Sequence, residues 1–578
     1  MRLESVCTGK TRHLDIRGQS VKTAFLKSAV SGPVQVTLDG LQGNEVAVHT
    51  DAIYAIALQH YQHWAERLGV DVVDWAPGFF AENLRIDGLD ETALNVGDVL
   101  SIGDEVRLSV SGPRVPCFKL CWQLDQPDTF IREFALSGKS GVYFNVECPG
   151  IIKAGDEIKI ESKATGTVGL LELSEYVFEK RTMNEDTLRH ILELPGLSET
   201  SALLLRNKLY QILDQQRTSG DRWQGWREFN VDHVVEETDE IKSFFLTPTD
   251  AKLLAPFRAG QFITVQLPIK NIESAIRVWS LSDYDNEPEQ YRLSIKREPQ
   301  STGGSAFMHE DVTVGSRLKL KPPMGRFVLD RSSFKPVLLI AGGIGITPLL
   351  SMAKAHLERG AKAPPLYFIH CCRNRAAQPF REELDQLSAN KGVNVQHVYD
   401  QPQIDDLLGT DYQIQGFLSL EHIEAFMQDC HIIHGGKRID MPWFESDIYL
   451  CGPPVFQSQL VDSLIEAGAN ENRLFTESFE SSIDDVRHVP IEKAEVVFST
   501  SGKSVIWRSD EDKTLLELAE AAGLDPDNAC RMGVCQSCST ILQEGKIHYK
   551  YSLTHPSVEG QVLLCSAVPG SERIVLEL

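Results

Sequence analysis

Short apolar runs separated by glycine and aspartate dominate the first part of the chain. Residues 33–38 and 104–110 carry Val, Ile and Leu in the brief, turn-bounded runs that are typical of β-strands. From about residue 168 to residue 218 the apolar positions instead recur every three or four residues, as on one face of a helix. The pattern predicts a mostly β domain over residues 1–163, followed by short helices.

A polar stretch at residues 215–226 is interpreted as a linker to the next part of the chain. Strand-like runs continue from there to about residue 330 and indicate a second small β domain. After Pro336 apolar strands alternate with helices, which is the order of a parallel α/β sheet. The expected strands of that sheet are residues 337–340, 366–370 and 447–451. Residues 480–492 form a further polar linker before a last small domain.

Charge and composition narrow the classes of partner. The 578 residues include 57 Lys and Arg against 81 Asp and Glu, and the net charge of -24 repels nucleic acid and anionic lipid. The N-terminal residues lack the apolar stretch of a secretory signal. Residues 337–352 are short for a membrane span and contain three glycines and a proline. We therefore expect a cytoplasmic protein that binds neither membrane nor nucleic acid.

Four cysteines near the C-terminus have the spacing of a metal centre. Cys530, Cys535 and Cys538 follow a C-x4-C-x2-C pattern, and Cys565 lies further along in a Leu-Leu-Cys-Ser segment. Plant-type [2Fe-2S] ferredoxins use this spacing. A structural zinc site is the alternative, but such sites usually pair two C-x2-C units. Residues 493–578 resemble a plant-type ferredoxin along their whole length, which implies that these four cysteines bind a [2Fe-2S] cluster.

A flavin-binding segment is indicated by three residues of one predicted strand. Arg277, Trp279 and Ser280 resemble the R-x-Y-S signature of the ferredoxin-NADP reductase superfamily, with Trp in place of Tyr. A flavin needs a cation for its phosphate, a flat aromatic ring against its own rings and a hydroxyl near N5. The three residue types supply these groups. Taken alone, the same segment would be an ordinary strand, and the motifs that follow make the difference.

Small residues at the start of a predicted helix bear on whether the flavin is FAD or FMN. Gly303, Gly304 and Ser305 open a helix whose first N–H groups suit a pyrophosphate, which favours FAD. Phthalate dioxygenase reductase has the same order of flavin, nicotinamide and ferredoxin domains and uses FMN. FMN is therefore the alternative.

A strand that enters a glycine-rich turn and a helix predicts a dinucleotide site. The residues of this turn are Gly342, Gly343, Gly345, Thr347 and Pro348. A second predicted turn consists of Cys451, Gly452 and Pro453. With both turns, residues 224–480 resemble the reductase part of flavohaemoglobins, in which the Cys-Gly-Pro turn lies beside the nicotinamide. Arg373 and Arg375 fit either a 2′-phosphate or a solvated loop, so NADH and NADPH both stay open, with NADH favoured.

Cys117 belongs to a motif that indicates a second metal centre. The segments 81–84, 112–120 and 137–143 resemble the MOSC family, specifically the YiiM-type proteins, and residues 168–214 resemble their small three-helix domain. The family cysteine that matches Cys117 binds molybdenum of the molybdenum cofactor, and a soft thiolate suits that metal. The expected partners of the pterin phosphate are Arg114, Lys119 and Lys139. An inert core cysteine is the alternative.

One departure from the MOSC pattern concerns the pocket. Many members have His-Gly-Gly where this chain has His49, Thr50 and Asp51, so the surroundings of His49 stay open. Cys121 and Cys148 lie near enough in sequence to compete as ligands, but neither is in the matching motif.

The resemblances imply a multidomain chain with five domains. These are a mostly β MOSC barrel at 1–163, a three-helix domain at 164–218, a β-barrel FAD domain at 224–332, an α/β NAD(P) domain with a parallel sheet at 333–482, and an α+β, β-grasp ferredoxin domain at 493–578.

The implied activity is reduction of small N-hydroxylated substrates with electrons from NAD(P)H. FAD would split the electron pair of the hydride, because the [2Fe-2S] cluster accepts one electron at a time, and the molybdenum cofactor would receive the electrons. The alternative is a reductase that supplies a separate oxygenase, with the MOSC domain binding cofactor or sulfur. The sequence leaves open whether the protein has an external electron acceptor and whether it forms a homodimer.

Overall fold

The computed structural model describes most of the chain. The described residues are 1–45, 51–220, 222–250, 252–269, 275–298, 303–360, 363–434, 437–479, 491–511, 513–528, 531, 533, 537–550 and 560–578. They separate into two compact units, Met1–Gln215 with Asp429–Pro442, and Gln216–Gln428 with Trp443–Leu578.

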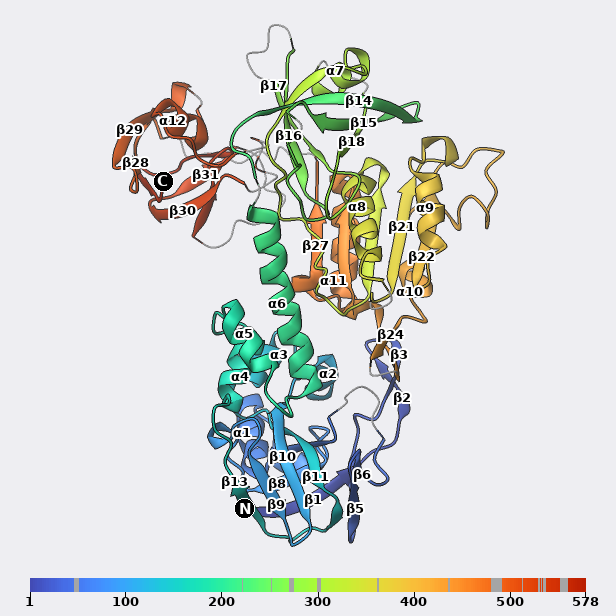
Figure 1. Ribbon diagram of the computed structural model, residues 1–578, viewed down its shortest axis with the longest axis vertical. Coiled ribbons are helices and arrows are strands. Elements are labelled where there is room, and N and C mark those ends of the chain that lie inside the picture. The colour runs from blue at the N-terminus through green and yellow to red at the C-terminus, as the bar shows by residue number, and fades with distance from the viewer. Residues whose placement is uncertain are drawn as a thin grey trace. The chain divides into compact units, whose positions relative to one another are not determined.

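The first unit is built on an eight-stranded sheet (Figure 1). In spatial order its strands are β13 (Ile158–Ser162), β9 (Val99–Ile102), β10 (Val106–Pro113), β11 (Val142–Cys148), β7 (Ile53–Ala57), β8 (Leu84–Asp87), β1 (Arg2–Thr8) and β4 (Ser28–Ala29). Only β7 and β8 are parallel to each other. Backbone hydrogen bonds from Leu3 N to Asp156 O and from Ile158 N to Met1 O join the β13 end of the sheet to β1.

Smaller strands and six helices complete this unit. The strands are β12 (Gly150–Ile152), β5 (Val34–Thr37) and β6 (Gly40–Leu41) in one sheet, the hairpin β2 (Arg12–Ile16) with β3 (Gln19–Thr23), and the hairpin β24 (His431–His434) with β25 (Lys437–Asp440). The helices are α1 (Leu58–Leu68), α2 (Phe118–Leu124), α3 (Phe130–Leu136), α4 (Leu170–Val177), α5 (Glu185–Leu192) and α6 (Glu199–Gly220).

Two clusters of buried side chains hold the first unit together. One is aliphatic and includes Leu188 and Ile191 of α5 with Leu205 of α6, which places the apolar faces of the predicted helices in the core. The other is aromatic, and in it Trp64 of α1 stacks on Phe134 of α3 at 4.8 Å between ring centroids.

The predicted linker at 215–226 is wrong over its first part. Helix α6 runs on to Gly220, so residues 215–220 are helical. The polar composition of this stretch favours a linker, but Gln and Arg are also good helix formers. Polarity alone does not end a helix.

The second unit begins with a six-stranded antiparallel sheet. Its strands, in spatial order, are β17 (Ala275–Ser280), β16 (Phe262–Leu267), β19 (Arg317–Leu320), β14 (Arg227–Thr238), β15 (Ile241–Pro248) and β18 (Tyr291–Lys296), with α7 (Gly304–Glu310) beside β17 and β18. Buried aromatic side chains fill its core, including Phe229, Phe244 and Tyr291.

A parallel sheet follows, as the alternation of strands and helices predicts. Its order is β23 (Ile414–Gln415), β22 (Val393–Tyr399), β21 (Leu366–Cys372), β20 (Val337–Gly342), β26 (Asp447–Cys451) and β27 (Leu474–Glu477). The helices of this region are α8 (Ile346–Leu357), α9 (Arg381–Ser388), α10 (Leu420–Phe426) and α11 (Pro454–Glu466). Residues 337–352, the apolar segment considered as a membrane span, are β20, a turn and the start of α8. Across the described ranges, no helix combines the length and hydropathy needed to cross a membrane.

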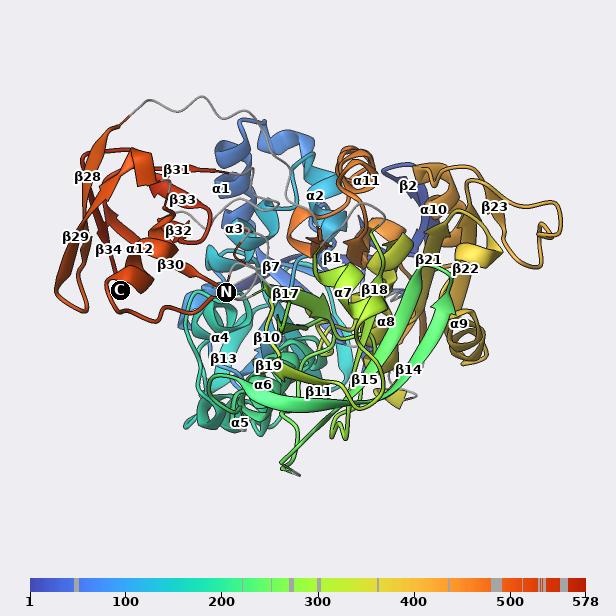
Figure 2. The ribbon, with the colours of Figure 1, turned by 90° about the horizontal axis from the view of Figure 1, so that it is seen from above.

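The last part of the chain forms a five-stranded mixed sheet with one helix (Figure 2). Its strands are β29 (Lys503–Arg508), β28 (Lys493–Phe498), β34 (Arg573–Leu576), β30 (Ser539–Glu544) and β32 (Gln561–Leu563), with the pair β31 (Ile547–Tyr549) and β33 (Ala567–Pro569). Helix α12 (Leu515–Ala521) buries Leu515 and Leu518 in the same core as Val496 and Ile574. The predicted linker at 480–492 lies outside the described residues except for its last two positions.

Candidate functional site

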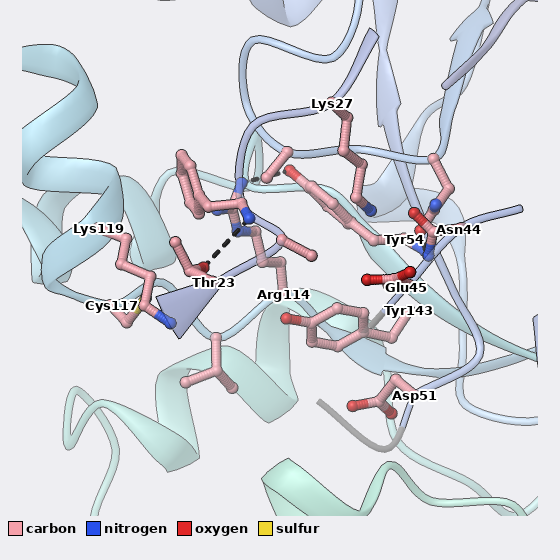
Figure 3. Close-up of a pocket in the computed structure, with 15 residues that line it drawn as sticks. Thr23, Lys27, Asn44, Glu45, Asp51, Tyr54, Arg114, Cys117, Lys119 and Tyr143 are labelled. Carbon is pink, nitrogen blue, oxygen red and sulfur yellow. Dashed lines mark hydrogen bonds between the residues drawn. The ribbon is translucent and has the colours of Figure 1, made fainter. Parts of the chain in front are cut away.

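A cavity in the first unit brings together side chains from five regions of its sequence (Figure 3). The polar lining residues are Thr23, Lys27, Asn44, Glu45, Asp51, Tyr54, Asn83, Arg114, Cys117, Lys119 and Tyr143. Cys117 is partly exposed at the start of α2, Arg114 follows the end of β10, and Lys119 lies in the first turn of α2. The cavity therefore contains three of the four residues predicted for the molybdenum cofactor.

Buried contacts fix the Arg114 side chain in the cavity wall. Arg114 is 4% exposed, and its Nη1 donates to Tyr54 Oη at 2.8 Å and to Phe80 O at 2.6 Å. Its guanidinium also lies 4.6 Å from the Tyr54 ring centroid. Tyr54 Oη donates in turn to Ser140 O at 2.8 Å. Arg114 thus has a defined orientation, which suits a residue that binds an anion.

Lys139, the fourth residue predicted for the molybdenum cofactor, does not line the cavity with Cys117, Arg114 and Lys119. It is absent from the described lining of the cavity, and its carbonyl oxygen accepts a hydrogen bond from Trp64 Nε1 at 3.0 Å. Its charge acts on His60, whose pKa is lowered to about 4 mainly by burial and further by Lys139. The role of Lys139 toward a pterin stays a prediction. His49 lies outside the described residues.

Lys27, Asp51 and Tyr143 line the cavity and were not singled out from the sequence. Burial lowers the pKa of Lys27 to about 7. Tyr143 is 3% exposed and follows the glycine-containing segment 137–143, and Asp51 follows His49 in the departing part of the MOSC pattern. The resemblance had already marked both segments, but it did not say which side chains face the cavity.

The predicted flavin residues lie on β17, beside the start of α7. Strand β17 pairs with β16, so that Arg277 is opposite Val265 and Trp279 is opposite Ile263. A Cβ on Gly304 would meet Arg277 Cγ at 2.5 Å, so the glycine allows the arginine side chain to lie against the helix start. The structure therefore brings Arg277 and Gly304 together, although the sequence separates them by a strand and a loop.

The other predicted flavin residues have defined places. Trp279 packs against the apolar core, and Ser280 is 5% exposed at the end of β17. Gly303 is the residue before α7, and Ser305 Oγ accepts a hydrogen bond from Glu298 N at 3.3 Å.

The two predicted nucleotide turns touch each other at the carboxyl ends of neighbouring strands. Gly342 ends β20, and the next residues form a single 3-10 turn, Gly343–Gly345, before α8. A Cβ on Gly452 would lie 3.0 Å from Gly342 Cα, and one on Gly342 would lie 2.9 Å from the Phe456 ring. These positions need glycine because the two turns are in van der Waals contact.

Thr347 and Cys451 are buried beside these turns, whereas Pro453 is exposed. Thr347 Oγ1 donates to Ile344 O at 3.1 Å, and Pro348 lies in the first turn of α8. Pro453 precedes α11, and Cys451, opposite Glu477 in the β26–β27 pairing, is fully buried. Burial raises the pKa of Glu477 to about 8. A neutral carboxyl therefore lies next to the thiol at physiological pH.

Arg373 and Arg375 both have carboxylate partners. Arg373 Nη2 lies 2.7 Å from Glu240 Oε1, and Arg375 Nη1 lies 3.5 Å from Asp411 Oδ1. Neither arginine is therefore a ready-made site for a 2′-phosphate.

Two of the four predicted cluster ligands are described, and they lie together. Cys538 and Cys565 are each 3% exposed. Gly533 N donates to Cys565 Sγ at 3.2 Å, and Cys565 N donates to Cys538 Sγ at 3.4 Å. Cys530 and Cys535 lie outside the described residues. Backbone donors at both sulfurs are the arrangement that stabilises anionic thiolates.

Three family models match separate parts of the chain. The MOSC domain matches residues 42–159, the oxidoreductase NAD-binding domain matches residues 339–462, and the 2Fe-2S iron-sulfur cluster binding domain matches residues 499–570. The first range contains Cys117, and the third contains all four predicted cluster cysteines.

Curated relatives match the reductase part. The flavohemoprotein of Rhodopirellula baltica is 35% identical over 276 residues, which are 46% of this chain and 64% of the relative. The flavohemoprotein of Chromobacterium violaceum is 32% identical over 309 residues, which are 52% of this chain and 71% of the relative. The chain thus spans less than two thirds of the first of these two proteins.

Two solved structures are similar to part of the chain. The FAD/NAD-binding domain of nitric oxide dioxygenase from Vibrio cholerae is 28% identical and covers 44% of this chain and 98% of its own, with a TM-score of 0.37. Phthalate dioxygenase reductase is 25% identical and covers 61% of this chain and 98% of its own, with a TM-score of 0.41. On the sequence match to the Chromobacterium violaceum relative, of which it covers 71%, the chain belongs to the flavohemoprotein-like FAD- and NAD-dependent reductases, and it joins that module to a MOSC domain and a 2Fe-2S domain in one polypeptide.

Proposed function

We propose that this oxidoreductase passes electrons from NAD(P)H, through FAD and the [2Fe-2S] cluster, to a molybdenum cofactor in the MOSC domain, and that it reduces small N-hydroxylated substrates there. The observation that carries the proposal is the position of Cys117 in a cavity with Arg114 and Lys119. The same polypeptide contains the NAD-binding and 2Fe-2S domains that would supply the electrons.

The cavity residues fit such a cofactor by their chemistry. A thiolate is a soft ligand for molybdenum, and a pterin phosphate needs cations and hydrogen-bond donors. Arg114, Lys119 and Lys27 supply the cations, and Asn44 and Asn83 supply amide donors. When bound, the cofactor would supply the two electrons that cleavage of the substrate N–O bond requires.

The residues of the reductase part would bind and orient the flavin and the nicotinamide dinucleotide. Arg277 and the start of α7 would hold the flavin phosphates, and Trp279 would lie against its rings. The two glycine turns would admit the dinucleotide close to the backbone. Glu477, with its buried neutral carboxyl, would keep negative charge away from the nicotinamide end of the site.

The test is Cys117→Ala, with Cys148→Ala as the matched control because Cys148 is an exposed cysteine of the same unit. Both variants are assayed for NADH-dependent reduction of an N-hydroxylated base and of ferricyanide. We expect Cys117→Ala to lose the first activity and keep the second, and Cys148→Ala to keep both.

Metal analysis of the same preparations distinguishes the alternative. We expect iron and molybdenum near two to one in the wild type, because each cluster holds two irons. Reduction of the N-hydroxylated base without Cys117 or without molybdenum contradicts the proposal. Iron without molybdenum, with electron delivery to a separate oxygenase, favours the oxygenase-reductase alternative.

A further inference from the structure

We propose that Asp51 is the proton donor to the leaving hydroxyl group when the substrate N–O bond breaks in the Cys117 cavity. This inference rests on the function proposed above. Asp51 lines the same cavity as Cys117 and is 8% exposed, and Figure 3 shows its side chain beside Tyr143.

Reduction of an N-hydroxyl group requires protons as well as electrons. The balance is R–NH–OH + NADH + H⁺ → R–NH2 + NAD⁺ + H2O. The N–O bond breaks, and the oxygen leaves as water after it gains a proton. Hydroxide is a poor leaving group, so an acid that protonates the oxygen as the N–O bond breaks accelerates the cleavage.

Two carboxyl groups, Glu45 and Asp51, line the cavity. Their surroundings shift their pKa values in opposite directions, which distinguishes a proton donor from a group that stays ionised. Glu45 accepts hydrogen bonds from Thr11 Oγ1 at 2.6 Å and Thr11 N at 2.8 Å and lies 3.2 Å from Lys10 Nζ. The Thr11 hydroxyl, with these other groups, lowers the pKa of Glu45 to about 2. Glu45 is therefore ionised at neutral pH and cannot donate a proton.

Asp51 has the opposite surroundings. Its Oδ2 accepts a hydrogen bond from Thr200 Oγ1 at 3.1 Å, and the hydroxyl groups of Ser198 and Ser111 also lie against the carboxyl. The ion pairs of the described residues include none with Asp51. Burial raises the pKa of the Asp51 carboxyl above its usual range. Asp51 is thus the carboxyl group of this cavity that holds a proton more readily.

Thr200 supplies a route by which Asp51 regains its proton. It lies in the first turn of α6 and is partly exposed, and its hydroxyl touches the Asp51 carboxyl. A hydroxyl both donates and accepts, so it can relay a proton from solvent to a buried carboxylate. The groups that face Asp51 and set its protonation are Ser111 of β10, Tyr143 of β11, Ser198 and Thr200, with Lys27, Glu45, Arg114 and Lys119 as the charged groups of the cavity.

The first experiment needs neither substrate nor molybdenum. The infrared spectrum of the full chain is recorded near neutral pH for the wild type, Asp51→Asn and Glu199→Gln. Glu199 is an exposed carboxylate next to Thr200 and pairs with Arg206, so it is the matched control. Because burial also raises the pKa of Glu91 and of Glu477 to about 8, the readout is the difference spectrum between each variant and the wild type. We expect Asp51→Asn to lose one component of the protonated carboxylic acid band and Glu199→Gln to lose none. A spectrum that is unchanged by Asp51→Asn overturns the inference.

The second experiment measures turnover with an N-hydroxylated base and with ferricyanide. We expect Asp51→Asn to lower kcat for the base on the order of 100-fold with little change in KM, because a general acid contributes roughly this factor. Molybdenum content and ferricyanide reduction should match the wild type. Thr200→Val, which keeps Asp51 and its cavity, should lower kcat by a smaller factor and give a larger solvent deuterium isotope effect.

The outcomes separate this inference from the proposed function. Wild-type turnover of the base in Asp51→Asn overturns the role of Asp51 and leaves the molybdenum reductase intact. A wild-type protein that is loaded with molybdenum and reduces ferricyanide but no N-hydroxylated compound overturns the proposed function, and this inference with it.

Discussion

Gly345 lies so close to Cys451 that a Cβ at position 345 would meet the Cys451 carbonyl oxygen at 2.3 Å. This contact joins the glycine-rich turn after β20 to the turn after β26. Because the opposing atom belongs to the backbone, it cannot rotate out of the way. The approach of the two turns, which shapes the nucleotide site, therefore depends on one hydrogen atom in place of a side chain.

We expect Gly345→Ala to weaken nicotinamide nucleotide binding. Overpacking costs about 1–3 kcal/mol, which corresponds to an increase in KM for NADH of about 5- to 150-fold. Gly342→Ala is the graded comparison, because its new Cβ would meet the Phe456 side chain, which can move. Ferricyanide reduction as a function of NADH concentration measures both. Equal KM values for Gly345→Ala and the wild type would contradict the steric argument.

Cys538→Ser and Cys565→Ser should each remove the iron-sulfur cluster without affecting hydride uptake. Both sulfurs accept backbone N–H groups in one buried site, and an alcohol does not replace a thiolate ligand of iron. We expect loss of the cluster absorbance and of its electron paramagnetic resonance signal, with the flavin still bleached by NADH. Cys148→Ser is the control. A cluster that survives both substitutions would place its ligands elsewhere.

The ion pair between Arg373 and Glu240 predicts a preference for NADH. We expect Glu240→Gln to release Arg373 for a 2′-phosphate and to lower KM for NADPH relative to NADH. Both side chains are about half exposed, so the gain should be at most about 1 kcal/mol, or roughly fivefold. The double variant with Arg373→Gln should lose that gain. A wild type with a lower KM for NADPH than for NADH would contradict the prediction.

His60 and Glu91 give the first unit a defined dependence of stability on pH. His60 Nδ1 lies 3.3 Å from Glu91 Oε1, and both residues are buried. Burial raises the pKa of Glu91 from 4.5 to about 8 and lowers the pKa of His60 from 6.5 to about 4. Glu91 therefore contributes stability that is present below pH 4.5 and lost as the pH rises to about 8, whereas His60 contributes stability that is gained between about pH 4 and 6.5.

Together the two groups should place the stability maximum between about pH 4.5 and 6.5. In Glu91→Gln only the His60 contribution remains, so the decline above pH 6.5 should flatten. Urea unfolding of the wild type and of Glu91→Gln across this range measures the difference in the free energy of unfolding. Glu66→Gln, an exposed position on α1, is the control. A decline that is the same in Glu91→Gln and the wild type would show that Glu91 is not its cause.

Local patterns in the sequence predicted many of the strands and helices and the NAD-binding and 2Fe-2S domains. The alternation of strands and helices predicts β20, β21 and β26, and the glycine spacing predicts the turn that follows β20. Both patterns involve residues that are close in sequence, and local residue preferences largely determine the backbone conformation at that scale. The end of α6 shows the limit, because a polar composition fits a solvated helix as well as a linker.

The cavity residues that were missed depend on contacts between distant parts of the chain. Asp51 and Thr200 are 149 residues apart, and no periodic pattern connects them. Lys139 belongs to the matching motif, yet the hydrogen bond from Trp64 to its carbonyl oxygen fixes its backbone in a loop outside the cavity. A motif therefore predicts which residue types are present more reliably than the direction in which their side chains point.

The amide groups that donate to Cys565 and Cys538 belong to the main chain. Such donors favour the more negative, reduced form of a cluster and so raise its reduction potential. Since every amino acid except proline carries the same N–H group, most substitutions around the loop leave them in place. The contribution of these donors to the reduction potential therefore depends on the backbone conformation of the loop. It can persist while the surrounding side chains change.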